Sequence, residues 1–345
     1  MPEHVEGDWW YPATDSTMRA MNSPDQLPIL AGAQAVQPAQ QPAVPALARL
    51  ARLLLANAPQ DGSFETCIPG VHAIRASTTS VELVHGLHRP ALCIVAQGAK
   101  TVMLGDESYE YDPSRMMIFS LDLPIAAMIR QASVAAPYLS FRLDFDQQRL
   151  AELILKAYPE GVPAVSNRRA VYVAQAGDAI VDAAARLMAL AGQPEDAALL
   201  APLAIDEIVL RLLRGPFGAR LAQLGRVESH RIGKVVDWIR RHYDRPIRID
   251  DMAELAHMSP SSLHEHFKSL TSMSPLQFQK TLRLQEARRL MLSTGMDAGL
   301  ACQRVGYASP SQFSREYARH FGSAPTRDMV RLRNAGLAQA VSFTQ

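Results

Sequence analysis

The sequence predicts an α+β protein of two domains, in which a small antiparallel β-barrel with flanking helices precedes an all-α domain. Three observations support this prediction. Short apolar and β-branched runs separated by turn signals fill residues 64–145. Helical periodicity begins at residue 146, and a helix-turn-helix pattern occurs twice near the C-terminus. The 345 residues, of which 48% are hydrophobic, are enough for two cores.

The beginning of the chain is not typical of a folded domain. Residues 1–45 are rich in Pro, Gln and Ala and are expected to form a disordered leader, whereas residues 46–57 (ALARLARLLLAN) predict a short amphipathic helix. No apolar run approaches the roughly 18 residues of a membrane span, and there is no signal-peptide pattern. The cysteines Cys67, Cys93 and Cys302 are isolated from one another. We therefore expect a cytoplasmic protein with reduced thiols and no membrane partner.

The barrel is predicted from a series of short strands. The runs HAIRAS, ALCIVAQGAKTVMLG, ESYEYDPSRMMIFSL and PYLSFRLDF have strand character. KTVMLGDESYEY predicts a hairpin, because polar turn residues (Gly105, Asp106, Glu107 and Ser108) lie between two extended arms. Many short strands without intervening helices indicate an antiparallel sandwich or small barrel.

This region carries weak signals for chemistry. A metal site needs three or four converging ligands, and HGLHRP places His85 and His88 three residues apart beside a proline, which is a loop spacing. We expect these residues and His72 to be surface or structural histidines, with no metal and no cofactor. No nucleophile and base arrangement typical of an enzyme is present. Cys93 is either an inert core residue or a thiol that faces an effector pocket.

Residues 146–225 are predicted to be helical. DQQRLAELILKAY, GDAIVDAAARLMALA and EDAALLAPLAIDEIVLRLLRG each have helical periodicity, and the third ends at Gly215 before a proline. In the first, an apolar stripe consists of Leu150, Leu153, Ile154 and Ala157. These helices pack either on the barrel or on a second copy of the chain, so a homodimer remains open.

The formal net charge of +1 hides an uneven distribution. From Arg226 to Arg333 there are eighteen Lys and Arg against eleven Asp and Glu, while the rest of the chain has seventeen against twenty-three. A basic C-terminal third favours a polyanionic partner, although ordinary solvated charge is the alternative.

The first helix-turn-helix pattern follows a predicted helix in RIGKVVDWIRRHYDRPI. IDDMAELAHMSPSSLHEHFKSLT predicts two short helices around a turn at His257. Ser259 caps the second helix and Pro260 occupies its first turn. The packed side of that helix carries Leu263, Phe267 and Leu270.

The same pattern returns about 50 residues later in DAGLACQRVGYASPSQFSREYARHFG. Here Gly306 forms the turn and Ser309 the cap, and the packed side carries Phe313, Tyr317 and Phe321. The turn favours a positive φ, which suits Gly306 and should strain His257. Ala253 and Cys302 occupy equivalent places where two helices cross closely, so Cys302 is first of all a packing residue.

Between the two units, PLQFQKTLRLQEARRLMLSTG predicts one long helix. From Leu276 to Leu292 it would span roughly 26 Å. Such a spacer can hold two reading helices about one DNA turn apart, roughly 34 Å, which favours double-stranded DNA over a protein partner.

From Arg231 to Arg331, and most specifically in FGSAPTRD, the chain resembles the DNA-binding domain of the AraC/XylS family of bacterial transcriptional regulators. RPALCIVAQGAK, YEYDPSRMMIFSLDLP and APYLSFRLDF resemble the cupin-like N-terminal domain of one branch of that family. The resemblance implies a cupin-like sensor domain at 46–225 and a DNA-binding domain at 226–333 with motifs at about 250–270 and 298–321. A tail follows at 334–345. It also implies promoter DNA and RNA polymerase as partners.

The resemblance assigns base contacts to Ser261, His264, Glu265, Ser311, Gln312 and Arg315. Arg315 suits guanine, Gln312 adenine and Glu265 cytosine. Alternatively, Arg315 grips a phosphate and Glu265 forms a surface ion pair. Phosphate contacts are expected from Ser262, Lys268 and Arg319. Two departures stand out: many relatives have a basic residue at 265 and a glutamate at 308, where this chain has Glu265 and Ala308. The second unit is therefore expected to be the stronger reader.

We therefore expect a sequence-specific transcription factor of the cytoplasm and nucleoid rather than an enzyme. An unknown small-molecule effector in the barrel would modulate its DNA binding, and activation is favoured by the resemblance. Two alternatives remain open. One is a cupin-type metalloenzyme with an accessory DNA-binding module, and the other is a ligand-independent DNA-binding protein with a vestigial barrel.

Overall fold

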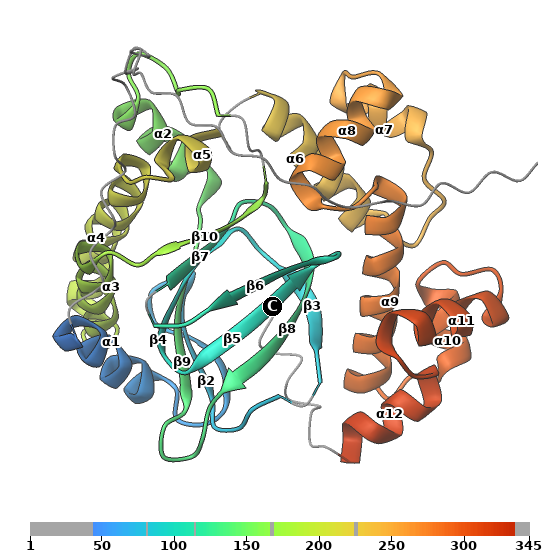
Figure 1. Cartoon of the computed structure of the whole chain (residues 1–345), viewed down its shortest axis with the longest axis horizontal. Helices are drawn as coiled ribbons and strands as arrows, with labels where there is room; N and C mark the ends of the chain where they lie inside the picture. Colours follow the sequence, from blue (N-terminus) through green and yellow to red (C-terminus); the bar gives the residue numbers. More distant parts are fainter. Residues whose placement is uncertain (1–43, 81, 114, 166–168, 224–226, 335–345) are drawn as a thin grey trace, which may run out of the picture. The chain divides into compact units, whose positions relative to one another are not determined.

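A computed structural model describes residues 44–80, 82–113, 115–165, 169–223 and 227–334 (Figure 1). The predicted leader therefore lies outside the described residues except for Val44 and Pro45, and the predicted tail lies outside them except for Asn334. The first helix, α1 (Val44–Asn57), begins two residues before the predicted start.

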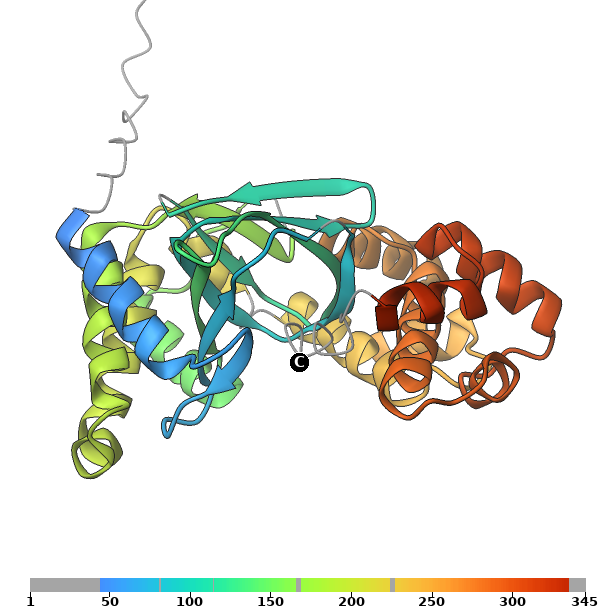
Figure 2. The same cartoon turned by 90° about the horizontal axis from the view of Figure 1, so that it is seen from below.

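The described N-terminal half contains ten strands in two antiparallel sheets. They are β1 (Gly62–Glu65), β2 (Val71–Ala76), β3 (Val84–His88), β4 (Ala91–Gln97), β5 (Ala99–Leu104), β6 (Glu107–Tyr111), β7 (Arg115–Phe119), β8 (Leu123–Gln131), β9 (Tyr138–Asp144) and β10 (Val171–Gln175). The six-stranded sheet has the order β1-β2-β9-β4-β7-β10, and the four-stranded sheet has the order β3-β8-β5-β6. The predicted antiparallel architecture is confirmed, as two facing sheets that form an open barrel (Figure 2).

The hairpin between β5 and β6 is also confirmed, with a shorter turn than predicted. Leu104 pairs with Glu107, so the turn consists of Gly105 and Asp106 alone, and Ser108 belongs to β6. Gly105 has a φ of 59°, a left-handed conformation that glycine adopts without strain.

Two local predictions were wrong. HGLHRP is not a loop, because His85 and His88 lie on β3, which pairs with β8 along its whole length. Residues 146–225 are not wholly helical, because β10 pairs with β7 in the six-stranded sheet. Both strands are held by partners distant in the sequence. The sequence around β3, with Gly86 and two histidines, has little strand preference of its own.

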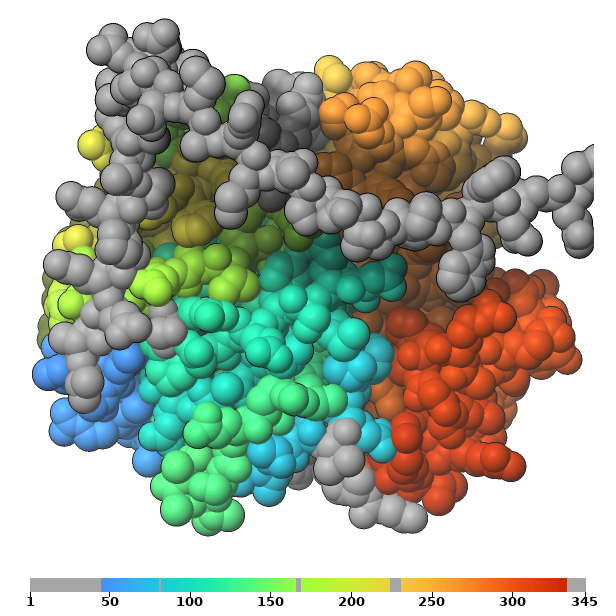
Figure 3. Space-filling view, viewed as in Figure 1, coloured from blue at the N-terminus to red at the C-terminus, as the bar shows by residue number. Residues whose placement is uncertain are grey.

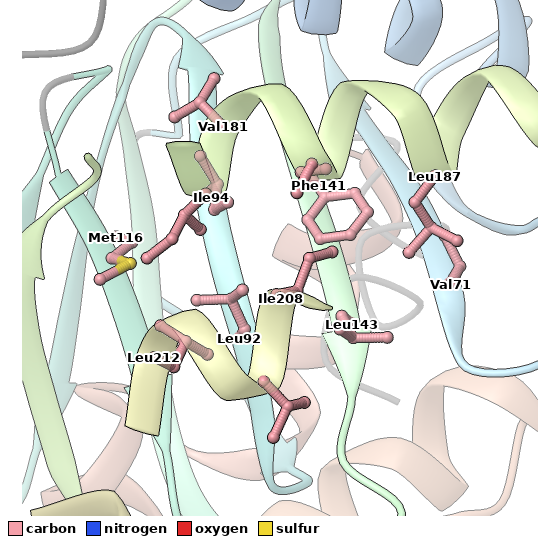
Figure 4. Packing of buried hydrophobic residues seen from close by; sticks show 14 of the residues in the cluster. Val71, Leu92, Ile94, Met116, Phe141, Leu143, Val181, Leu187, Ile208 and Leu212 are labelled. Carbon is pink, nitrogen blue, oxygen red and sulfur yellow. The ribbon is translucent and has the colours of Figure 1, made fainter. Parts of the chain in front are cut away.

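Helices cover one face of the six-stranded sheet. They are α1, α2 (Gln147–Ala157), α3 (Asp178–Leu190), α4 (Pro194–Arg214) and α5 (Gly218–Ala222). Asp146 caps α2, whose buried residues are those of the predicted stripe, and α4 ends at Gly215 as predicted. Residues of α3 and α4 such as Val181 and Ile208 pack against Ile94 and Phe141 of the sheet (Figure 4). This outer core leaves the other face of the sheet for the barrel interior.

The C-terminal part of the described chain is helical. It consists of α6 (Val227–Arg241), α7 (Ile249–Ala256), α8 (Pro260–Thr271), α9 (Pro275–Ser293), α10 (Ala298–Arg304), α11 (Pro310–Phe321) and α12 (Pro325–Asn334). The predicted long spacer is α9, which opens with a capping box formed by Ser274 and Gln277. None of the described helices combines the length and apolar character needed to cross a membrane.

Candidate nucleic-acid interface

The first helix-turn-helix unit comprises α7 and α8. His257 ends α7 in the left-handed conformation, with φ and ψ both 50°. The Met258 amide then donates a hydrogen bond to the Ala253 carbonyl at 2.9 Å. The Ser259 hydroxyl accepts from the Ser262 amide at 3.2 Å, which caps α8. The predicted positive φ and cap are confirmed, and the turn is built on a residue that tolerates this conformation only under strain.

The second unit comprises α10 and α11 and has the same construction. Gly306 has a φ of 83°, and a Cβ atom there would lie 1.8 Å from the Asp244 carbonyl oxygen. Glycine is therefore required at this turn both for its conformation and for space. The Ser309 hydroxyl accepts from the Gln312 amide at 3.3 Å, which confirms the predicted cap of α11.

Each reading helix is seated by its apolar side. The predicted packed residues Leu263, Phe267, Leu270, Phe313, Tyr317 and Phe321 are all buried, as are Ala253 and Cys302 at the helix crossings. In the second unit a polar network adds to this packing. The Tyr317 hydroxyl donates to Asp328 at 2.8 Å, and Arg288 of α9 binds the same carboxylate at 2.9 and 3.2 Å. Helix α11 is therefore fixed to both α9 and α12.

The opposite sides of both helices face solvent. All six predicted base-contacting residues are exposed: Ser261, His264 and Glu265 on α8, and Ser311, Gln312 and Arg315 on α11. Lys268 and Arg319 are exposed and Ser262 is half-buried. On the face seen in Figure 3, the orange residues of the first unit and the red residues of the second form separate regions.

Two of the predicted base-contacting residues, Glu265 and Arg315, are charged, and no described residue forms an ion pair with either of them. Glu265 and Arg315 make no hydrogen bond or ion pair within the described part of the chain. The surface ion pair considered for Glu265 is therefore absent there, and both side chains are available to an outside partner.

Glu316 was not predicted, yet it organises the second reading helix. Its carboxylate lies 3.0 Å from Lys280 Nζ of the spacer and accepts from the Tyr307 hydroxyl at 2.8 Å and from the Gln312 side-chain amide at 3.4 Å. Burial opposes ionisation of Glu316, but these hydrogen bonds outweigh it and lower its pKa. The first unit has Met258 and His266 at the equivalent positions, so it lacks this network. The sequence signal was the i, i+4 spacing of Gln312 and Glu316.

Arg319 lies next to the barrel as well as on the reading helix. It lines a cleft of about 480 Å³ together with His320 of α11 and with His85 and Met103 of the barrel. His85 lies in ring contact with His320, the two centroids being 5.1 Å apart. The predicted phosphate contact of Arg319 therefore borders a surface shared with the sensor domain.

Cys93 lies inside the barrel and is fully enclosed. Its sulfur is 3.7 Å from His88 Nε2, and burial raises the pKa of the thiol to about 11. Burial also lowers the pKa of His88 to about 3, so this imidazole stays neutral and stacks on Phe119. A buried, protonated thiol is a poor nucleophile, which favours a packing or contact role over reaction with an electrophile.

The remaining histidine of the barrel, His72, lies 3.5 Å from the Asp144 carboxylate. Within the described ranges, no three His, Cys, Asp or Glu side chains are grouped so that they could hold a metal ion.

Two capped reading helices with exposed polar faces, each preceded by a tight turn and joined by one long helix, define the class of DNA-binding proteins with tandem helix-turn-helix units. Residues 67–220 match the model of the AraC-type transcriptional regulator N-terminus, and residues 252–329 match a helix-turn-helix domain model. The chain belongs to the AraC/XylS family of transcriptional regulators.

Individual relatives are distant. The regulator CdhR of Pseudomonas aeruginosa is 26% identical over 184 residues, which cover 50% of this chain and 54% of CdhR. The regulator ExsA of the same organism is 27% identical over 130 residues, covering 37% and 47%. The chain thus spans about half the length of these relatives. A crystal structure of ToxT from Vibrio cholerae O395 matches with a TM-score of 0.52 at 12% identity, covering 76% of this chain and 98% of ToxT, which shows a shared fold.

Proposed function

We propose that this protein is a sequence-specific transcription factor that reads double-stranded promoter DNA with α8 and α11. The observation that carries the proposal is the pair of matched units, each with an exposed polar face, on the ends of a 19-residue helix. At 1.5 Å per residue α9 is roughly 28 Å long, close to the roughly 34 Å between successive major-groove faces of DNA.

Within this proposal the second unit is the stronger reader. Arg315 would bind guanine through two hydrogen bonds and Gln312 an adenine edge, whereas the first unit offers His264 and Glu265. Ser261 and Ser311 would make shorter contacts to base edges. Ser262, Lys268 and Arg319 would position the helices on phosphates, as most protein contacts to the DNA backbone do.

The sensor half would adjust this binding. A small molecule in the barrel can shift the population of DNA-competent states only through a difference in its affinity for them. By family membership we infer activation through RNA polymerase, and a place of action at the nucleoid in the cytoplasm. We further infer a homodimer, because α4 exposes Leu199 and Leu203 to solvent.

The test is footprinting of the full-length protein on its own promoter region, followed by affinity measurements over a range of KCl concentrations. Protection of two sites on one DNA face, with affinity that falls steeply with salt, is expected. Uniform protection, or an affinity indifferent to salt, would contradict the proposal. Stoichiometric metal in the purified protein by elemental analysis would instead favour a metalloenzyme with a DNA-binding module.

A further inference from the structure

Lys100 occupies an unusual place in the barrel. It lies on β5, where the buried residues Val102 and Leu104 alternate with half-buried neighbours and point inward with it. Lys100 is only 7% exposed. No described residue accepts a hydrogen bond from its ammonium group or forms an ion pair with it. Directly across the strand pair, Tyr111 of β6 faces the same interior.

The other charges inside the barrel do not compensate Lys100. In the six-stranded sheet Arg142 of β9 is paired with Cys93 of the neighbouring strand β4. Its guanidinium donates hydrogen bonds to the Asp144 carboxylate at 2.6 and 3.2 Å. That pair is neutral as a unit. His88 carries no charge near neutral pH, because burial lowers its pKa to about 3. Among the described residues, Lys100 therefore has no counter-charge in the interior.

Two phenols, Tyr111 and Tyr138, also belong to the buried interior. The Tyr138 hydroxyl is buried, and no described residue gives it a hydrogen bond of normal geometry, although the Tyr111 and Ser140 hydroxyls lie close enough to influence its pKa. Burial raises the pKa of both Tyr138 and Tyr111, so both phenols stay protonated. Buried donors without acceptors are rare in folded proteins and usually indicate a water, an ion or a ligand. An isolated buried cation is costlier still, and burial lowers the pKa of Lys100 accordingly.

We propose that the barrel interior binds a small organic monoanion through a carboxylate, with Lys100 as its cationic partner and Tyr138 as a hydrogen-bond donor. One carboxylate supplies both the missing charge and the missing acceptor. A dianion such as phosphate would leave an excess negative charge. The apolar part of the ligand would contact interior residues such as Val95, Phe119 and Ile125. This inference rests on the proposed effector function and identifies the chemical class of the effector.

The test uses the full-length protein and two variants, Lys100→Met and the matched control Lys156→Met, whose lysine lies exposed on α2. The probes are hexanoate and benzoate, their neutral amides, and chloride as an inorganic monoanion. Carboxylates should raise the melting temperature of the wild type and of Lys156→Met, whereas the amides and chloride should not. In Lys100→Met the Kd for the carboxylate should rise about tenfold or more, the loss expected for one charge-assisted hydrogen bond.

Three results would overturn the site: no carboxylate shifts the melting temperature, the amides act equally, or Lys100→Met binds as the wild type does. The variant itself provides a separate check. Methionine removes an uncompensated buried charge at similar length, so unliganded Lys100→Met should melt no lower than the wild type. A marked decrease would mean that Lys100 already has a partner within the protein and would equally contradict the inference.

Promoter affinity with and without hexanoate separates this site from the proposed function. Binding that depends on Lys100 and leaves promoter affinity unchanged supports the site and contradicts its role as an effector site. Salt-dependent promoter binding by a protein that ignores every carboxylate supports the transcription factor and rejects the site.

Discussion

Arg315 and Glu316 are neighbours on α11 with opposite environments. Arg315 projects into solvent without a partner in the described part of the chain, whereas Glu316 is held by Lys280, Tyr307 and Gln312. Glu316 therefore fixes the Gln312 side chain rather than Arg315. Its bond from the Gln312 Nε2 atom leaves the amide oxygen and one N–H for an adenine edge.

The Arg315→Ala variant tests the base-reading role of this side chain. A bidentate contact to guanine discriminates by about 1–3 kcal/mol, so binding to the specific site should weaken by that amount and binding to random DNA only slightly. Fluorescence anisotropy with both DNAs at one salt concentration measures it. Arg327→Ala is the matched control, because it also removes one positive charge but lies outside α11. Equal losses on specific and random DNA would assign Arg315 to a phosphate instead.

The Glu316→Gln variant tests the network. The amide keeps the shape but removes the charge that binds Lys280, so we expect a weaker preference for adenine at the position read by Gln312, with Arg315 discrimination less affected. Affinities for operators with single base changes measure this. His266→Gln in the equivalent place of the first unit should leave the preference unchanged, because no such network exists there. An unaltered base profile in Glu316→Gln would refute the positioning role.

At the scale of elements, the turns of the two helix-turn-helix units have the same left-handed conformation but different residues. Both need a positive φ after the first helix, which His257 adopts at 50° and Gly306 at 83°. The Gly306 turn also lies against the backbone of Asp244, which fixes it to the turn that follows α6. The two turns therefore have the same backbone conformation, but only the turn at Gly306 is also restricted by close backbone packing.

Exchanges at the two turns should act in opposite directions. His257→Gly relieves left-handed strain and should raise the free energy of unfolding by about 0.5–1 kcal/mol. Gly306→Ala introduces both strain and a backbone clash and should lower it by more than about 2 kcal/mol. Urea unfolding of both variants measures the two changes in the free energy of unfolding. Stabilisation by Gly306→Ala, or a large loss in His257→Gly, would contradict the geometry of the turns.

At the scale of the whole molecule, α4 exposes two leucines on the outer side of the helices that cover the six-stranded sheet. Leu199 and Leu203 of α4 are 76% and 65% exposed, one turn apart on the same side of the helix. The opposite side of α4, with Ile208 and Leu212, packs in the outer core. An apolar stripe on an otherwise amphipathic helix is typical of an interface with a second copy.

The double variant Leu199→Glu with Leu203→Glu should therefore be monomeric where the wild type is a dimer, since two carboxylates cannot be buried in an apolar contact. Sedimentation velocity over a concentration series measures the association. Leu155→Glu, at a leucine equally exposed on α2, should leave the dimer intact. A monomeric wild type, or a dimer that survives the double change, would contradict the inferred interface.

Local patterns were enough to predict both helix-turn-helix units, their caps, their packed residues and the spacer. All of these depend on neighbours within one or two helical turns. The β5–β6 hairpin was predictable for the same reason. The strands β3 and β10 were not, because each forms only when a distant strand, β8 or β7, supplies its hydrogen bonds.

The interior of the barrel likewise depends on tertiary structure. The sequence singled out Cys93 because it lies in a clear strand pattern. That Lys100 points inward beside Tyr111, and Arg142 beside Cys93, follows from the strand registers, which are set by pairing between strands. The Glu316 network is also tertiary, because Lys280 reaches it from another helix. Short-range periodicity therefore determines which helices exist, whereas the charges gathered in the barrel and around α11 are decided only when distant segments pack.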